Sequence, residues 1–277
     1  MSETLYPPPR PQSIGEVLDL SFRIYRRTFA RCLVLGGFVV VANWLPNLYA
    51  IARGQAVVQA VVKPVPDLGY AVATIIAVLL ALLFPVAIIY RQYKIITGQQ
   101  SGGEMLRALR LLGRIVLTVI LYALVVALCL LLLVPAMFVS GLTRYALIAV
   151  LLLPCAYVLL RLACAFTAMV VENTGAAASL ARSWELTGGQ VLRLTAVYTV
   201  ALFLLAVLYA AVGSLTALLY AVLGRGDVAL IAAGVGVMTV AAGALASPYY
   251  SALGLAVFGD LLVRKEGADL SQRISAT

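Results

Sequence analysis

The 277-residue chain contains no histidine and only 11 acidic residues. Histidine is the side chain that most often moves protons in catalysis near neutral pH, and acidic residues supply most of the other acid–base groups. The sequence also lacks a GxxxxGKS/T phosphate loop, a GxSxG nucleophile elbow and a GxGxxG dinucleotide fingerprint. We therefore expect a protein that is not an enzyme and that needs no cofactor.

Cysteine is scarce as well, with four residues and no C-x-x-C pair. Cys32, Cys129, Cys155 and Cys164 lie in or beside apolar stretches, where a free thiol behaves as a small hydrophobic side chain. Disulfide-rich and zinc-binding proteins instead show cysteines clustered at fixed spacings. The sequence predicts neither a disulfide framework nor a metal site.

Charged residues make up 11% of the chain and hydrophobic residues 64%, against about 25% and about 45–50% in soluble domains. Six apolar runs each reach the roughly 20 residues that a helix needs to cross about 30 Å of hydrocarbon. The runs cover 33–52, 70–90, 115–138, 146–171, 191–212 and 228–258. We therefore expect an all-α integral membrane protein with six transmembrane helices.

The basic residues predict the orientation of these helices. Fifteen Lys and Arg residues fall in the N-terminal lead, the second and fourth loops and the tail, against four in the other loops. Because Lys and Arg accumulate on the cytoplasmic side of a membrane, both termini should be cytoplasmic, in a bacterial inner membrane. This asymmetry also accounts for the net charge of +9 without any nucleic-acid partner.

Short helices with one polar face are predicted before the first, third and fifth runs. Ser13 to Glu16 and Ser101 to Glu104 have the spacing of capping boxes, and a third helix should start near Thr174. The chain then forms three in–out–in hairpins, each preceded by a cytoplasmic amphipathic helix. A shared way of starting helices, without a true internal repeat, is the alternative. We expect one transmembrane bundle, with a cytoplasmic lead (1–32), a six-span core (33–258) and a cytoplasmic tail (259–277).

Basic residues line the polar faces of the first two of these helices. Such a helix lies in the headgroup plane and attracts anionic lipid by about 1 kcal/mol per basic residue near the surface. We expect this surface to bind anionic headgroups or a partner protein, and simple anchoring is the alternative. The basic interfacial face consists of Arg23, Arg26, Arg27, Arg31, Arg107, Arg110 and Arg114.

Arg161 lies deep inside the fourth apolar run, about ten residues and therefore roughly 15 Å from the end of that run at Glu172. An arginine near the midplane costs about 2.5–3.5 kcal/mol on insertion scales. Its expected partners are Asn43, at the same depth in the first run, tyrosine hydroxyls such as that of Tyr157 on its own helix, or carbonyls freed by Pro154. This intramembrane polar cluster is either a clamp between helices or a counter-charge for an anionic ligand.

Two further features concern the last two runs, which are longer than a membrane requires. We expect the fifth to break near Gly213-Ser214 and the sixth near Pro248. Small residues four positions apart predict close packing of the last helix. These pairs are Ala232 with Gly236, Ala242 with Ala246, and Gly243 with Ser247.

Three stretches of the chain share the pattern of one family. They are Arg10–Phe29 (RPQSIGEVLDLSFRIYRRTF), Glu172–Leu194 with the core SWELTGG at 183–189, and the tail from Asp260 to Leu270. In these stretches the chain resembles the bacterial family labelled glycerophosphoryl diester phosphodiesterase membrane domain, which overlaps YciC-like proteins. The resemblance implies a six-span helical fold and no settled biochemical role. Departures in the tail are Gly259, Leu262 and Ala268.

The family label does not imply a hydrolase here, because that chemistry calls for a metal held by carboxylates and for histidines. The sequence instead predicts a non-enzymatic inner-membrane scaffold or complex subunit that binds lipid. Its expected partners are anionic headgroups and either another protein or a second copy. The alternative is a transporter or channel-like module for an anionic substrate, with Arg161 in its path.

Overall fold

The computed structural model describes residues 6–99, 102–223 and 227–275, and every regular element in these ranges is a helix. Six segments are long and apolar enough to cross a membrane: α1, α3, α5 with η1, α6 with α7, α9 and α10. This confirms an all-α protein with six helices of membrane-spanning length. The elements are α1 (Ile14–Ala52), α2 (Val57–Val62), α3 (Leu68–Ile96), α4 (Glu104–Arg110), α5 (Leu112–Leu133), the 3₁₀ helix η1 (Val134–Phe138), α6 (Leu142–Arg161), α7 (Ala165–Val171), α8 (Ala176–Leu186), α9 (Val191–Leu223) and α10 (Val228–Ser275).

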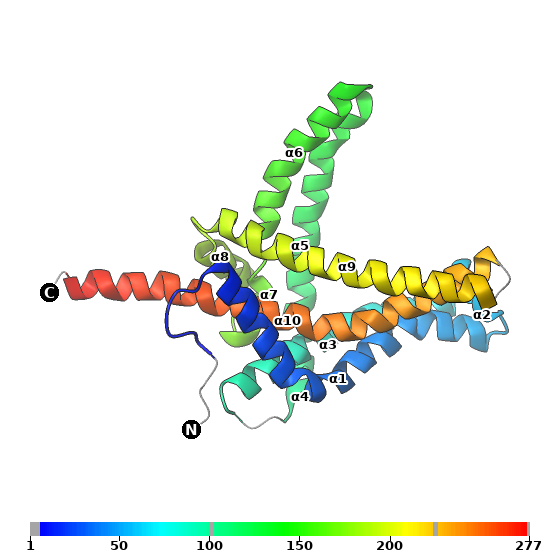
Figure 1. Cartoon of the computed structure of the whole chain (residues 1–277), viewed down its shortest axis with the longest axis horizontal. Coiled ribbons are helices and arrows are strands. Elements are labelled where there is room, and N and C mark those ends of the chain that lie inside the picture. Colours follow the sequence, from blue (N-terminus) through cyan, green and yellow to red (C-terminus); the bar gives the residue numbers. More distant parts are fainter. Residues whose placement is uncertain (1–5, 100–101, 224–226, 276–277) are drawn as a thin grey trace.

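The first helix starts where the sequence predicted. Ser13 is its N-cap: the Ser13 hydroxyl accepts from the N–H of Glu16 at 3.3 Å, and the Glu16 carboxylate accepts from the N–H of Ser13 at 2.6 Å. The helix then continues to Ala52, so the predicted boundary between a separate amphipathic helix and the first span is absent. Figure 1 shows that α1 instead changes direction part-way along. α8 starts after Gly175, as predicted.

The capping box predicted at Ser101 is wrong. α4 begins at Glu104, and its N-cap is Gly103, whose φ of 70° lies in the left-handed region that favours glycine. The Glu104 carboxylate accepts from the N–H of Gly102 at 2.7 Å. Ser101 itself lies outside the described residues. A turn of two glycines therefore starts this helix where a serine cap was expected.

The predicted breaks in the last two spans are also wrong. α9 runs without interruption through Gly213, and α10 does so through Pro248. The chain breaks instead in the fourth span, where a turn separates Arg161 at the end of α6 from Ala165 at the start of α7.

Neighbouring hydroxyls explain why Pro248 does not end α10. A proline removes the N–H that would reach the carbonyl oxygen of Ala244. The Ser247 hydroxyl donates to that oxygen at 3.4 Å, and the Tyr25 hydroxyl donates to the carbonyl oxygen of Leu245 at 3.1 Å. Because donors from the same helix and from α1 serve these carbonyls, the helix continues.

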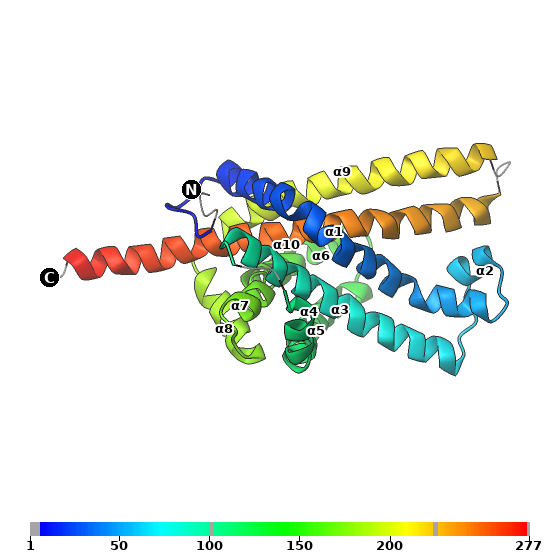
Figure 2. The same cartoon turned by 90° about the horizontal axis from the view of Figure 1, so that it is seen from below.

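Four long helices form a layer. Figure 2 shows α9, α10, α1 and α3 side by side in that order, and each neighbouring pair is in contact. Gln92 of α3 is fully buried, and its amide donates to the Thr28 hydroxyl of α1 at 3.1 Å and to the Pro248 carbonyl of α10 at 2.8 Å. One polar side chain therefore joins three helices of the layer.

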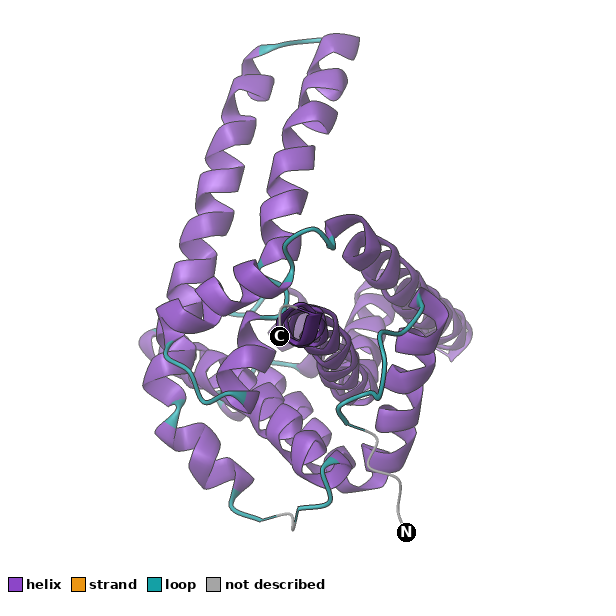
Figure 3. Ribbon diagram, turned by 90° about the vertical axis from the view of Figure 1, so that its left-hand side faces the viewer, coloured by secondary structure: helices purple, strands orange, loops and turns teal. Residues whose placement is uncertain are grey.

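The second pair of spanning helices leaves this layer. α5 and α6 lie against each other and project from the layer at a steep angle (Figures 1 and 3). α5 buries only Ile115 and Thr118, while large apolar side chains such as Leu124 and Leu131 are exposed. The described spanning helices therefore do not form the single six-helix bundle that the sequence predicted. The pair joins the rest of the chain through Leu111 and the turn at 162–164.

The start of α1 and the end of α10 lie toward one end of the layer in Figure 1, whereas α2, the end of α9 and the start of α10 lie at the other. α4 and α8 also lie away from the α2 end. This is the arrangement that two cytoplasmic termini require of α1, α3, α9 and α10. The side of the membrane that each end faces stays a prediction.

Candidate functional site

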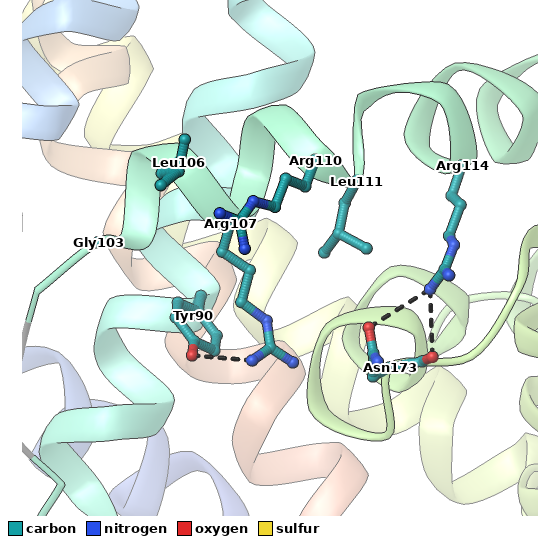
Figure 4. Close-up of a pocket in the computed structure, with 8 residues that line it drawn as sticks. All are labelled: Tyr90, Gly103, Leu106, Arg107, Arg110, Leu111, Arg114 and Asn173. Carbon is teal, nitrogen blue, oxygen red and sulfur yellow. Dashed lines mark hydrogen bonds between the residues drawn. The ribbon is translucent and has the colours of Figure 1, made fainter.

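A basic pocket lies between the end of α3 and the start of α5 (Figure 4). Its volume is about 430 Å³, within the usual range for small-molecule sites. Three of its lining residues are arginines, and none of the described ones is acidic. The pocket is lined by Tyr90 of α3, Gly103, Leu106, Arg107 and Arg110 at α4, Leu111, Arg114 of α5 and Asn173.

Tyr90 fixes the position of Arg107. One guanidinium nitrogen of Arg107 donates to the Tyr90 hydroxyl at 3.0 Å, and the guanidinium carbon lies 4.5 Å from the centre of the ring. The ammonium of Lys94 lies 4.9 Å from the same ring, and it also donates to the carbonyl of Gly102 at 3.0 Å. Since the phenol is neutral, the charge of Arg107 is held in place without being cancelled.

Asn173 does the same for Arg114. One guanidinium nitrogen of Arg114 donates both to the backbone carbonyl and to the side-chain oxygen of Asn173, each at 3.3 Å. The φ of Asn173 is 55°, a left-handed conformation that asparagine adopts more readily than most residues. Arg110 lies between the two on the chain and is exposed, and its side chain forms no hydrogen bond with another described residue. Figure 4 shows Arg107 and Arg114 extending on either side of Leu111.

Glu104 holds α4 in position beside the pocket. Its side chain is buried at 4% exposure, and its carboxylate lies 3.4 Å from the Arg91 guanidinium of α3. Arg91 in turn donates to the Arg31 carbonyl of α1 at 2.7 Å. Burial raises the pKa of Glu104, but the N–H groups of Glu104 and Gly102 and the charge of Arg91 together lower it below the ordinary value of 4.5. The carboxylate form of Glu104 therefore attaches α4 to α3 of the layer through Arg91.

The predicted basic interfacial face is divided in the structure. Arg107 and Arg110 of α4 and Arg114 of α5 come together at the pocket, although the sequence placed all three on one helix. The other four members lie exposed along the first part of α1 and do not line the pocket. These four are Arg23, Arg26, Arg27 and Arg31.

The predicted intramembrane cluster is only partly formed. Arg161 and Tyr157 do lie together, with the guanidinium carbon 5.8 Å from the centre of the Tyr157 ring. Asn43 has no bond to Arg161: it is exposed on α1 and its amide donates to the Val39 carbonyl at 2.8 Å. The physical reason is that Arg161 belongs to the projecting pair of helices and Asn43 to the layer. In place of Asn43, the ring of Trp184 in α8 lies 4.3 Å from the guanidinium.

An ion-pair cluster around Asp260 ties three distant parts of the chain together. Asp260 of α10 is 2% exposed, and its carboxylate accepts from the N–H of Gln12 at 2.7 Å. The same carboxylate lies 2.9 Å from Arg193 of α9 and 3.0 Å from Arg264. Both arginines also donate to the Gln12 carbonyl. The start of α1 is thereby attached to α9 and α10.

A second cluster surrounds Arg182 of α8. Its guanidinium lies 3.0 Å from Glu172, 3.4 Å from Glu185 and 2.7 Å from Glu266 of α10. With the Asp260 cluster, it joins the three stretches 10–29, 172–194 and 260–270 in space. Neither cluster includes Arg107, Arg110 or Arg114 of the pocket.

Sequence reasoning missed Tyr90, Lys94 and Asn173 as parts of the site. Tyr90 and Lys94 are four residues apart at the end of an apolar run, a spacing that places an aromatic ring beside a cation on one helix face. That signal was available. Asn173 carried none, because only the fold decides which arginine meets the loop between α7 and α8.

The pocket presents the positive charge of three arginines to a ligand. Within the described residues there is no group of three or more Cys, Asp or Glu side chains placed to hold a metal ion. Positive charge in a preformed pocket suits binding of an anion. No family model, curated protein or solved structure matches this chain.

Proposed function

We propose that the chain is a non-enzymatic scaffold or complex subunit of a bacterial inner membrane, anchored by an anionic phospholipid whose headgroup occupies the basic pocket. The observation that carries the proposal is the arrangement of Arg107, Arg110 and Arg114 around one cavity without a described carboxylate. Arginine matches phosphate geometry through its planar fork of donors. Both termini would lie in the cytoplasm, on the side of this pocket.

An apolar cavity supports a lipid over a soluble anion. It has a volume of about 440 Å³ and is lined by residues of α3, α7, α9 and α10, including Leu82, Ile89, Phe166 and Tyr198. Ile89 lines this cavity, and the next residue, Tyr90, lines the basic pocket. A polar and an apolar binding surface thus follow each other along α3, as the headgroup and acyl chain of one lipid require.

The projecting pair α5–α6 supports the scaffold role. Its exposed apolar side chains would face lipid or another protein within a membrane. The resemblance to the membrane-domain family, which has no settled activity, points the same way. Arg161 lines neither the basic pocket nor the apolar cavity, so we do not extend the proposal to transport.

Native mass spectrometry of the purified chain in mild detergent tests this proposal. Phosphatidylglycerol should bind more tightly than phosphatidylcholine. A triple variant Arg107→Gln, Arg110→Gln, Arg114→Gln should weaken phosphatidylglycerol binding by roughly 100-fold, since each arginine contributes about 1 kcal/mol. The same spectra should show a self-oligomer or a bound protein partner.

The matched control removes the same charge from α1 in the triple variant Arg23→Gln, Arg26→Gln, Arg27→Gln. It should keep most of the affinity, because these side chains do not line the pocket. An equal loss in both triple variants would mean that binding depends on net charge alone and would refute the pocket. A lone monomer without lipid or partner would refute the scaffold.

A further inference from the structure

Arg161 is buried without an anionic partner. Its side chain ends α6 at 8% exposure, no ion pair of the described residues includes it, and its Nε is buried without a hydrogen-bond acceptor. The ring of Trp184 at 4.3 Å compensates for part of this through a cation–π contact. Such a contact is weaker than the cost of burying an unpaired charge, so part of that cost is left.

A second cation approaches the same place. A Cβ on Gly188 would lie 3.3 Å from a terminal guanidinium nitrogen of Arg161 and 3.6 Å from the ammonium nitrogen of Lys265 in α10. Both positive groups therefore flank one glycine, where no side chain separates them. The backbone carbonyl oxygen of Glu185 lies 3.2 Å from the same Cβ, but it carries no full charge. The two cations therefore repel each other across this glycine, and an anion between them would offset that repulsion.

The nearby carboxylates are already engaged. Glu185 of α8 and Glu266 of α10 are the acidic neighbours of this region along the chain, and both bind Arg182. Glu172 binds the same arginine. In the described part of the chain, two cations thus lie beside Gly188, while the neighbouring carboxylates pair with Arg182 instead.

The backbone around Arg161 is fixed before any ligand arrives. The hydroxyls of Ser183 and Thr187 donate to the Arg161 carbonyl at 2.8 and 3.1 Å, and Ser183 also accepts from the N–H of Cys164 at 3.2 Å. Gly189, with a φ of 76°, then turns the chain into α9. α9 is 33 residues long and begins at Val191, so the unpaired N–H groups of its first turn lie within a few residues of Gly188.

We propose that Arg161 and Lys265 bind a phosphate group at the turn formed by Gly188 and Gly189. This site is separate from the basic pocket. It includes the SWELTGG stretch at 183–189, in which Ser183, Trp184 and Thr187 position Arg161. The phosphate belongs either to a soluble phosphorylated molecule or to a lipid headgroup. The chemistry of recognition is the same for both.

The test measures binding to the full-length chain in detergent after delipidation, with inorganic phosphate and short-chain phosphatidic acid as separate probes. Isothermal titration calorimetry should show at least tenfold weaker binding for Arg161→Gln and for Lys265→Gln. Gly188→Ala should weaken binding as well, because its Cβ would enter the space beside both cations. Arg53→Gln removes an exposed charge at the end of α1, outside this site and the basic pocket, and should bind both probes as the wild type does.

Binding of inorganic phosphate that depends on Arg161 and Lys265 would support a soluble ligand. Binding of phosphatidic acid alone with the same dependence would support a lipid. Binding of neither probe, or binding that both substitutions leave unchanged, would overturn the proposal. Lys265 is exposed, so Lys265→Gln keeps the test decisive even where Arg161→Gln fails to fold.

Discussion

The backbones of α1 and α10 approach each other at a residue without a side chain. A Cβ on Gly36 would lie 2.6 Å from the carbonyl oxygen of Ala244, and a helical carbonyl cannot move aside as a flexible side chain can. In apolar surroundings, helix association depends on such close approaches at small residues. The neighbouring Gly37 meets nothing within 4 Å. A side chain therefore fits at Gly37 but not at Gly36.

We expect Gly36→Ala to lower the free energy of unfolding by about 1–3 kcal/mol, because α1 and α10 must move apart. Gly37→Ala should leave stability unchanged or raise it by up to about 1 kcal/mol, since alanine favours a helix over glycine. Thermal unfolding in one detergent, followed by circular dichroism, measures both variants. Equal unfolding midpoints for the two would show that α1 and α10 are not packed this closely.

At the scale of elements, α4 depends on its attachments. It has seven residues, far fewer than an isolated helix needs for stability in water. Glu104 supplies its main polar link to α3 through Arg91. Because Arg107 and Arg110 belong to this helix, the pocket keeps its shape only while α4 is docked.

Acidification should loosen α4. The folded-state pKa of Glu104 is below its ordinary value of 4.5, so its stabilising contribution is complete well above that value and is lost as the pH falls through the folded-state pKa. Amide hydrogen exchange of residues 104–110, corrected for its intrinsic pH dependence, should lose protection as the pH falls below 4.5 and through the lowered pKa of Glu104. Glu104→Gln should start with less protection and change less. A loss of equal size in both proteins would exclude Glu104 as the titrating group.

Local sequence patterns predicted the elements better than their arrangement. The apolar runs and the N-cap at Ser13 are local signals, so the helices they predict are present. The link from Gln92 to Pro248 spans 156 residues, and no periodicity specifies such a partner. The pocket shows the same division: its arginines were predicted from one helix face, whereas Asn173 came from a distant loop. The angle of α5–α6 could not be predicted either, because an apolar face fits many apolar surfaces.

At the scale of the whole molecule, the steep angle between α5–α6 and the layer is incompatible with one flat bilayer crossed by all six helices. Spanning helices tilt by about 0–40° from the bilayer normal. The chain enters the pair at Leu111 and leaves it at the turn at 162–164, and the pair also contacts the layer where α5 meets α3 and α6 meets α9. If all six segments span, these two connections must act as a joint that turns during insertion.

Electron paramagnetic resonance can measure this turn. Spin labels at Ser140, in the loop at the tip of α5–α6, and at Gln59 of α2 would be placed in a variant without the four native cysteines. Since α6 has 20 residues and is roughly 30 Å long, alignment of the pair with the layer should shorten the distance between labels by tens of ångströms. We expect shorter distances in nanodiscs than in detergent. The same distance in both would contradict a turning joint.

The cluster around Asp260 can form only late in synthesis, because Asp260 is made after both of its partners Gln12 and Arg193. Gln12 leaves the ribosome 248 residues before Asp260, which corresponds to roughly 12–50 s of translation. The N–H of Gln12 lacks this carboxylate throughout that interval, and the charge of Arg193 lacks it while the last 67 of these residues are added. A chain that stops before α10 never supplies the carboxylate to either group. The cluster therefore distinguishes a finished chain from a truncated one, and cellular proteolysis could act on that difference.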